Sequence, residues 1–138
     1  MQVDVLIQDL TFDSEHAYVV VPGGFGKGAK VWTDRIYTVQ SFPAELAGAT
    51  YIQTPVADRA SRSKQLITLM VTKNVDVYVG LKSGMKVQPW LADWEKTGQV
   101  IEAANTLQCY RKSFKSGDTV VLGSCPGPAM YTVVIQEQ

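Results

Sequence analysis

Hydrophobic and polar residues alternate in several short segments of the chain, most clearly in residues 75–82. There, valines and a leucine occupy every second position, between polar residues, a tyrosine and a glycine. Alternate side chains of a strand point to opposite faces of a sheet. The pattern therefore predicts a strand with one face in a core and the other toward water.

Other segments are rich in β-branched and aromatic residues and are separated by turn-forming residues. The further predicted strands are residues 3–7, 17–21, 30–39, 50–54, 65–72, 98–101, 107–114, 119–122 and 130–135. Residues 30–39 contain a charged pair, which fits either one bulged strand or two shorter strands. Residues 65–72 are nearly continuously hydrophobic, which predicts a strand covered on both faces.

Three connections complete this pattern. Residues 73–74 have the length of a tight hairpin turn between the strands on either side of them. Residues 9–15 are predicted to form a turn, and residues 55–63 are polar and are predicted to form an exposed loop.

Helical signals are confined to two short segments. Residues 42–46 and residues 90–94 each suit about one helical turn. Long amphipathic helical patterns are absent from the sequence, which argues against alternating strands and helices. The sequence therefore predicts an all-β fold, a single antiparallel β-sandwich of jelly-roll type over residues 1–138, with one or two short helical turns.

Composition narrows the function classes. The 138 residues include 13 lysines and arginines against 13 aspartates and glutamates, and neither sign forms a run. Nucleic-acid binding depends on clustered positive charge, so it is not expected. The apolar runs are too short to span a bilayer, and the chain shows no signal peptide, so no membrane association is expected.

The two cysteines leave two alternatives open. Cys109 and Cys125 could form a disulfide, or each could be a reduced and buried small residue. The spacing of the two residues does not decide between them.

Candidate chemistry is sparse. His16 is the chain's one histidine, and no further ligands lie at a metal-binding spacing from it, so it is interpreted as a turn residue. The glycines of residues 23–28 match no phosphate-binding pattern and indicate a flexible loop. The carboxylates are scattered and show no calcium-binding pattern. We assign no catalytic residue, metal ligand or cofactor.

The aromatic residues are the more informative group. Trp90 and Trp94 lie four positions apart, so a helical turn would place them on one side. At least one of the two is expected in the core, and the other is a candidate for stacking on a ligand. Exposed aromatic rings beside planar polar groups suit the stacking and hydrogen bonding of sugars. The candidate ligand-binding residues are Trp90, Trp94, Trp32, Tyr78, Asp34, Arg35 and Arg111.

A succession of short motifs runs from residue 29 onward. These motifs are VWTDRIY (31–37), PAELAGA (43–49), YIQT (51–54), VYVG (77–80), PWL (89–91), TG (97–98), YRKSF (110–114), LG (122–123) and MYTVV (130–134). Their order resembles a family of bacterial β-sandwich modules that are appended to large exported proteins, including polysaccharide-degrading enzymes.

The resemblance implies a carbohydrate-binding or adhesive accessory role without chemistry of its own, in a secreted or cell-surface protein. The chain departs from the family pattern in two places. After the Tyr78 strand, Gly80-Leu81-Lys82-Ser83-Gly84 stands where the family pattern leads us to expect an acidic or basic polar residue, and Ser124-Cys125 follows Leu122-Gly123 where the family has an asparagine. Ligand contacts at these positions would be altered or lost.

Three functions follow as hypotheses. The first is a non-catalytic module that binds a polysaccharide or other glycan through exposed aromatics. The second is a structural module that assembles with itself or with a neighbouring domain. The third is a small hydrolase or lyase, which requires a cleft with two carboxylates or with a tyrosine and an arginine.

Overall fold

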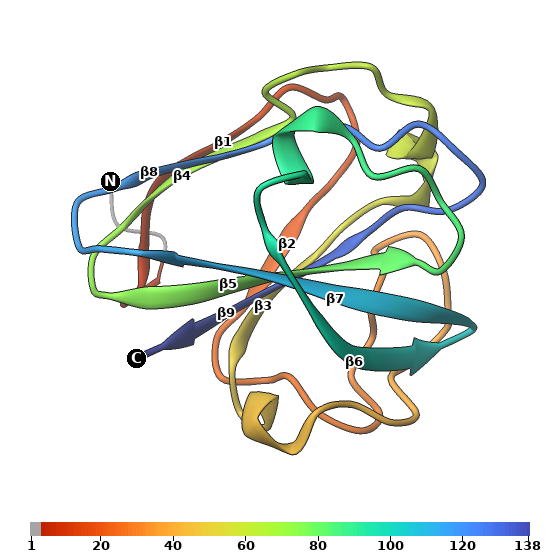
Figure 1. Ribbon diagram of the computed structural model, residues 1–138, viewed down its shortest axis with the longest axis horizontal. Helices are drawn as coiled ribbons and strands as arrows, with labels where there is room; N and C mark the ends of the chain where they lie inside the picture. The colour runs from red at the N-terminus through yellow and green to blue at the C-terminus, as the bar shows by residue number, and fades with distance from the viewer. Residues whose placement is uncertain (1–3) are drawn as a thin grey trace.

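The computed structural model describes residues 4–138, which form two antiparallel β-sheets (Figure 1). The smaller sheet has the order β1 (Ile7–Phe12), β4 (Ile67–Val71), β8 (Thr119–Leu122). The larger has the order β2 (Val19–Val21), β3 (Thr50–Gln53), β9 (Thr132–Glu137), β5 (Val75–Lys82), β7 (Asn105–Phe114), β6 (Glu95–Ala103). Three short 3-10 helices lie in the connections: η1 (Ala44–Leu46), η2 (Val56–Ala60) and η3 (Pro89–Leu91). The predicted all-β antiparallel sandwich is confirmed.

Strand β5 lies inside the larger sheet and pairs with both β7 and β9. Its alternating aliphatic residues are fully buried, as the period of two predicts. The opposite face is buried at Tyr78 and Gly80 and half-buried at Asp76 and Lys82. The expectation that this face points toward water was therefore wrong for the middle of the strand.

The long connection formed by residues 22–49 explains this burial. Tyr51 lies opposite Val134, and Val134 lies opposite Tyr78, so these three side chains point to the same face of the sheet. Phe25, in the connection, packs edge-on against Tyr51 with ring centroids 5.4 Å apart. The connection thus forms a cover that a pattern local to β5 does not reveal.

Strand β4 corrects two other expectations. Its residues alternate between buried and half-buried, so only one face is fully covered. Thr68 and Met70 lie on the half-buried face. Residues 73–74 do not form a hairpin, because β4 pairs with β1 and β8 whereas β5 belongs to the other sheet. They carry the chain from one sheet to the other.

Residues 30–39 form isolated bridges and no regular strand. Their hydrophobic residues Val31, Trp32 and Val39 are buried, so they fill the core from a loop. The predicted polar loop of residues 55–63 contains η2, in which Val56 and Asp58 are buried. In both segments, tertiary packing decides the backbone conformation.

The N-terminal strand is shifted relative to its prediction. Residues 1–3 lie outside the described residues, and residues 4–6 form a bend. Strand β1 then runs through part of the predicted turn, with an irregularity in its pairing between Gln8 and Thr11. Asp9, within that irregularity, has a positive φ of 55°.

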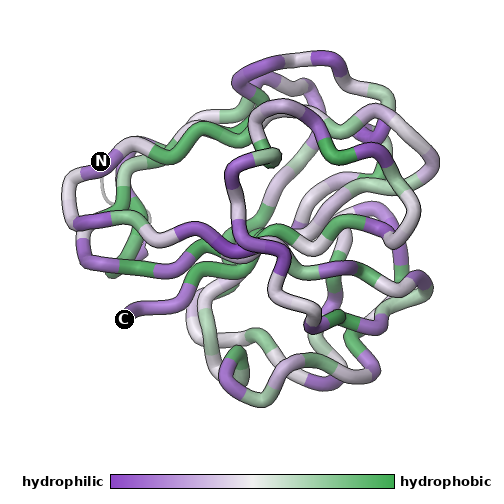
Figure 2. Tube along the Cα trace, viewed as in Figure 1, coloured by the Kyte–Doolittle hydropathy of each residue, from purple (hydrophilic) through white to green (hydrophobic). Residues whose placement is uncertain are grey.

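Strand β8 has its predicted bounds, and η1 lies within the predicted segment 42–46. Helix η3 begins one residue before the predicted segment 90–94 and ends at Leu91, so Trp94 lies outside it, and β6 is longer than the predicted strand of residues 98–101. Hydrophobic and hydrophilic residues alternate along the strands (Figure 2). One cluster of buried residues forms the core and includes members of both sheets and of the connection formed by residues 22–49. Residues 4–138 contain no helix long and apolar enough to cross a membrane.

Candidate functional site

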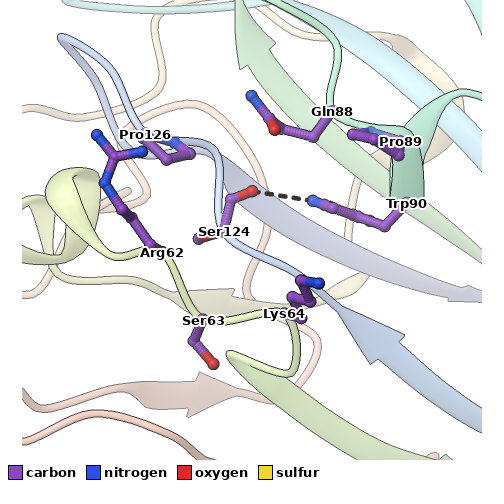
Figure 3. A pocket seen from close by; sticks show the side chains of 8 residues that line it. All are labelled: Arg62, Ser63, Lys64, Gln88, Pro89, Trp90, Ser124 and Pro126. Atoms are coloured by element: carbon purple, nitrogen blue, oxygen red, sulfur yellow. Dashed lines mark hydrogen bonds between the residues drawn. The ribbon is translucent and has the colours of Figure 1, made fainter.

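A hollow of about 440 Å³ opens where three separate segments meet, and Figure 3 shows the side chains around it. Its lining residues are Arg62, Ser63, Lys64, Gln88, Pro89, Trp90, Ser124 and Pro126. They come from the chain after η2, from the start of η3 and from the loop between β8 and β9. We call this feature the Trp90 hollow.

Backbone hydrogen bonds fix two of these segments to each other. The Ser124 N–H donates to the Ser63 carbonyl oxygen at 2.8 Å. The Gly127 N–H donates to the carbonyl oxygen of Arg59 at 3.0 Å. Behind the loop, the buried Tyr131 hydroxyl donates to the Gly123 carbonyl oxygen at 2.9 Å. The walls of the hollow are therefore held in place without a ligand.

The Trp90 indole is oriented by several contacts. Its Nε1–H donates to the Ser124 carbonyl oxygen at 3.0 Å. Its ring lies perpendicular to that of Trp94, with centroids 6.0 Å apart, and packs on Tyr131 at 5.7 Å. A Cβ atom at Gly123 would lie only 2.6 Å from the indole Cδ1, so glycine permits the close approach. Trp90 is thus a half-buried, fixed part of the wall.

The charge of the hollow is positive. Arg62 and Lys64 are exposed, and none of the residues that line the hollow is acidic. The hydroxyl of Ser63, between Arg62 and Lys64, donates to a carboxylate oxygen of Asp13 at 2.6 Å. The Asp13 carboxylate therefore contacts this segment through Ser63. A site of this composition can stack an apolar ring face and bind polar or negative groups around it.

The structure separates the residues that the sequence grouped as a binding site. Trp90 alone among the seven lines the Trp90 hollow. Trp94 is 7% exposed, between Trp90 and Phe114, which confirms that one of the two tryptophans lies in the core. Trp32 and Tyr78 are 2% and 3% exposed, so the expectation that they are exposed was wrong.

Trp32 and Arg35 meet instead at a second, smaller hollow of about 170 Å³. Its lining residues are Trp32, Arg35, Tyr37, Val56, Arg59, Ala104, Asn105, Pro128, Ala129 and Met130. The Trp32 Nε1–H donates to the Met130 carbonyl oxygen at 3.1 Å, so this indole is fixed in the core. Tyr37 is half exposed and meets Trp32 edge-on.

Asp34 has a structural contact that its sequence position does not suggest. Its carboxylate accepts hydrogen bonds from the backbone N–H groups of Val56 at 2.7 Å and Ala57 at 3.0 Å, at the start of η2. Partial burial opposes ionisation of Asp34. The two amides and the nearby Arg35 guanidinium outweigh that effect and lower the pKa of Asp34.

Arg111 lies elsewhere, on the larger sheet. It is opposite both Tyr78 and Glu95 in the strand register and pairs with the Glu95 carboxylate. Hydrogen bonds to Tyr78 and Glu95 raise the pKa of Arg111. Ligand-binding roles for Asp34, Arg35 and Arg111 stay predictions, and none of the three lies at the Trp90 hollow.

Sequence reasoning missed Arg62, Lys64 and Gln88. The segment DRASRSK contains three basic residues within residues 59–64, a local signal that was interpreted as an exposed loop. Its meeting with Trp90 depends on the fold, because the two segments are far apart along the chain. Gln88 carries no signal of its own beyond its position before η3.

A second missed feature joins His16, Tyr18 and Asp58. The Tyr18 hydroxyl donates to one Asp58 carboxylate oxygen at 2.5 Å, and His16 Nδ1 lies 2.6 Å from the other. Burial opposes ionisation of Asp58, but hydrogen bonds from Ser14, Tyr18 and His16 outweigh it and lower the pKa of Asp58. His16 is therefore a fixed partner of η2 as well as a turn residue.

The cysteines are both free and buried. Burial raises the pKa of the Cys125 thiol to about 12, and burial together with the Glu45 carboxylate raises that of Cys109 to about 12. Within residues 4–138, no group of three or more His, Cys, Asp or Glu side chains is placed to hold a metal ion.

Comparison with known proteins places the fold among domains of larger enzymes. No protein-family model and no curated protein sequence matches the chain. A β-glucuronidase of glycoside hydrolase family 2 contains a similar structure, with a TM-score of 0.91 and 20% sequence identity over 99% of this chain. An enzyme of glycoside hydrolase family 138 that targets pectin rhamnogalacturonan II matches with a TM-score of 0.64 and 17% identity over 100%.

This chain spans only a small part of either protein, 15% of the first and 18% of the second. At these identities the similarity concerns the fold. The chain has the fold of a β-sandwich domain that occurs within glycoside hydrolases.

Proposed function

We propose that this chain is a non-catalytic glycan-binding module whose ligand occupies the Trp90 hollow. The observation on which the proposal rests is the fixed, half-buried indole of Trp90 beside polar and basic groups. A flat aromatic ring packs well against the apolar face of a sugar, and nearby amide, hydroxyl and cationic groups can bind its substituents. The volume of about 440 Å³ lies within the usual range of small-ligand sites.

The structural neighbours support a carbohydrate context. Both are glycoside hydrolases, and in both the similar region is a small part of a longer chain. The proposed module therefore belongs to a carbohydrate-active protein that is secreted or displayed at a cell surface, and the chemistry lies in other domains.

Tryptophan fluorescence provides the test. Because Trp32 and Trp94 are buried, quenching by acrylamide reports chiefly on Trp90. A panel of neutral and acidic polysaccharides is titrated while emission and quenching are recorded. We expect a ligand that shifts the emission and protects Trp90 from acrylamide.

Two variants and one control locate the site. Gln88→Ala and Trp90→Phe should each weaken binding by about three- to tenfold, the loss expected of one polar or stacking contact. Tyr37→Ala, at the smaller hollow, should leave affinity unchanged. Unchanged binding in both hollow variants would overturn the site, and no binding by the folded protein to any glycan would overturn the proposal.

A second candidate is a domain that packs on a neighbouring domain or on itself. It is favoured by the adjacent residues Ile36 and Tyr37, which are 89% and 50% exposed. An exposed apolar pair in a turn is typical of an interaction surface when it forms part of a larger patch. Light scattering over a range of protein concentrations tests self-association. A mass that rises with protein concentration in the wild type, but stays at the monomer value in Ile36→Ser, would favour this candidate. The protein should then also show no response to any glycan.

The hypothesis of a small hydrolase or lyase can be tested at the smaller hollow. No carboxylate lines either hollow, but Tyr37 lies beside Arg35 and Arg59 in the smaller one. This meets the minimal composition that the hypothesis requires, in a space of only about 170 Å³. Incubation with the glycans of the panel, followed by measurement of reducing ends and of unsaturated products, tests it directly.

A further inference from the structure

We infer that the Trp90 hollow takes a sugar that carries a negative charge, a uronic acid or a sulfated sugar, with its anionic group against Arg62 and Lys64. The inference rests on the proposed glycan-binding function and specifies its ligand class. It follows from the distribution of charged groups around the hollow, from their lack of partners and from the shape of the opposite wall.

Two cations and no anion line the hollow. Figure 3 shows the Arg62 guanidinium beside Pro126 and the Lys64 side chain on the side of Trp90. Because both side chains follow the same backbone segment, which is hydrogen-bonded to the loop at Ser124, their starting points are fixed. Both cations attract an anionic group of a ligand that occupies the hollow.

Three cations elsewhere in the molecule have acidic partners, although other exposed lysines, such as Lys86 and Lys96, form no ion pair among residues 4–138. Arg111 pairs with Glu95, Lys112 with Asp93 at 2.8 Å, and Lys73 with Glu137 at 3.9 Å. No such ion pair to Arg62 or Lys64 occurs among residues 4–138. The nearby carboxylate of Asp13 accepts a hydrogen bond from the Ser63 hydroxyl instead. The two cations at the hollow therefore remain available to a ligand.

The opposite wall defines the rest of the ligand. Trp90 and Pro89 present apolar surface across from Arg62, and Pro126 adds apolar surface beside it, which suits the carbon–hydrogen face of a pyranose ring better than a small inorganic anion. The side-chain amide of Gln88 can both donate and accept hydrogen bonds, as a sugar hydroxyl requires. An anionic group on the same ring would reach an arginine, whose planar fork matches carboxylate and sulfate oxygens.

Screening by salt gives this inference a signature of its own. Exposed charge pairs contribute modestly in water, and their contribution falls as the Debye length shortens from about 30 Å at 0.01 M salt to about 3 Å at 1 M. Binding of an acidic sugar should therefore weaken about five- to twentyfold over such a range, whereas stacking of a neutral sugar should change little.

The experiment uses matched ligands on the full chain. Calorimetric titrations compare a galacturonic acid trimer, its methyl ester, a galactose trimer and a sulfated galactan trimer, at low and high salt. At low salt, we expect the charged trimers to bind at least about tenfold more tightly than the methyl ester and the galactose trimer. This ratio corresponds to a difference in binding free energy of about 1.4 kcal/mol. The uronate and sulfate arms identify which anion the hollow prefers.

Charge-removing variants assign the effect to the hollow. Arg62→Gln with Lys64→Gln should abolish the preference for charged trimers, and both positions are exposed, so the fold should be retained. Lys115→Gln, at an exposed position between β7 and β8, removes a positive charge elsewhere and should leave the preference intact. A single-stranded oligonucleotide serves as a generic polyanion and should bind weakly.

The outcomes are separable. Equal, salt-insensitive binding of neutral and charged trimers would overturn the inference and leave the proposed function standing. Absence of binding to every sugar would overturn both. A charge preference that survives the double variant, or that the oligonucleotide shares, would place the effect outside the hollow and overturn the inference.

Discussion

Gly123 shows how one residue without a side chain sets the position of a binding group. Its α-carbon lies so close to the Trp90 indole that an added methyl group would meet three ring atoms at 2.6 to 3.1 Å. The indole cannot retreat freely, because Trp94 and Tyr131 pack against it. The space at residue 123 is therefore part of the hollow's construction.

Substitution Gly123→Ala should destabilise the protein by about 1–3 kcal/mol, the usual cost of overpacking a tight contact. It should also increase the exposure of Trp90 to acrylamide. Gly127→Ala is the matched control, because its added methyl group would meet only the mobile end of Met85. Urea denaturation and quenching measure both effects, and equal stability of the two variants would contradict the steric argument.

Asp58 gives a prediction about acid. Its pKa is lower in the folded protein than the ordinary value of 3.8, so the folded state holds the ionised form more strongly than the unfolded state. The resulting stabilisation is present above pH 3.8 and is lost as the pH falls through the lowered pKa.

Replacement Asp58→Asn should cost about 1–3 kcal/mol near neutral pH, since Tyr18 and His16 lose a charged, buried partner. The difference from the wild type should shrink as the pH falls below 3.8 through the lowered pKa of Asp58, because the wild-type carboxylate then becomes protonated. Urea denaturation at both pH values measures it. A difference that is independent of pH would mean that Asp58 acts through its shape rather than its charge.

At the scale of elements, η2 shows that a short helix can be capped from outside its own sequence. The residue before it, Pro55, makes no side-chain capping bond, and Asp34 supplies the acceptor from a distant loop. One carboxylate thus ties residues 33–38 to the helix that precedes Arg62 and Lys64.

Loss of this cap in Asp34→Ala should reduce the free energy of unfolding by about 0.5–2 kcal/mol. Asp34→Asn keeps one acceptor oxygen and should recover part of the loss. Thermal denaturation of the three proteins measures the series. An alanine variant as stable as the wild type would show that water replaces the carboxylate without cost.

The sequence predicted elements well where the pattern was local. Strand β8 and the core of β5 follow from alternation, and the turn at Trp90 follows from its proline and spacing. Residues 30–39 contain the same β-forming residue types, but their buried side chains fill the core from a loop, which depends on packing partners elsewhere in the chain.

The sequence identified some residues of the candidate site and missed others. The sequence identified Trp90 and its core neighbour Trp94 through their spacing, and the structure makes Trp90 a wall of the hollow. Arg62, Lys64 and Gln88 could not be joined to it, because only the three-dimensional arrangement brings these segments together. Tyr78 was interpreted as exposed because the cover of residues 22–49 was not foreseen, and Trp32 because its segment was not expected to fill the core from a loop.

At the scale of the whole molecule, the order of the strands brings the walls of the hollow together. The segment before β4, the turn before β6 and the loop after β8 converge at one place although the two sheets contribute different strands. The same architecture, with a TM-score of 0.91 over nearly the whole chain, occurs within a much longer glycoside hydrolase. A stable scaffold with variable connecting loops accommodates new ligands without a change of fold.

The labelling rates of the two buried thiols can report how often this scaffold opens locally. Cys109 lies midway along β7, an internal strand of the larger sheet, and Cys125 lies between Ser124 and Pro126, which line the hollow. A thiol reagent can modify each one only during excursions that expose it, so the two labelling rates report the opening of two different regions.

Mass spectrometry of labelled peptides should show Cys125 reacting faster than Cys109 in the native protein, because a loop opens more readily than an internal strand. A bound glycan should slow the reaction of Cys125 and leave that of Cys109 nearly unchanged. Equal rates at both cysteines, with or without ligand, would mean that the loop opens only when the entire sandwich unfolds. The hollow would then be as durable as the fold itself.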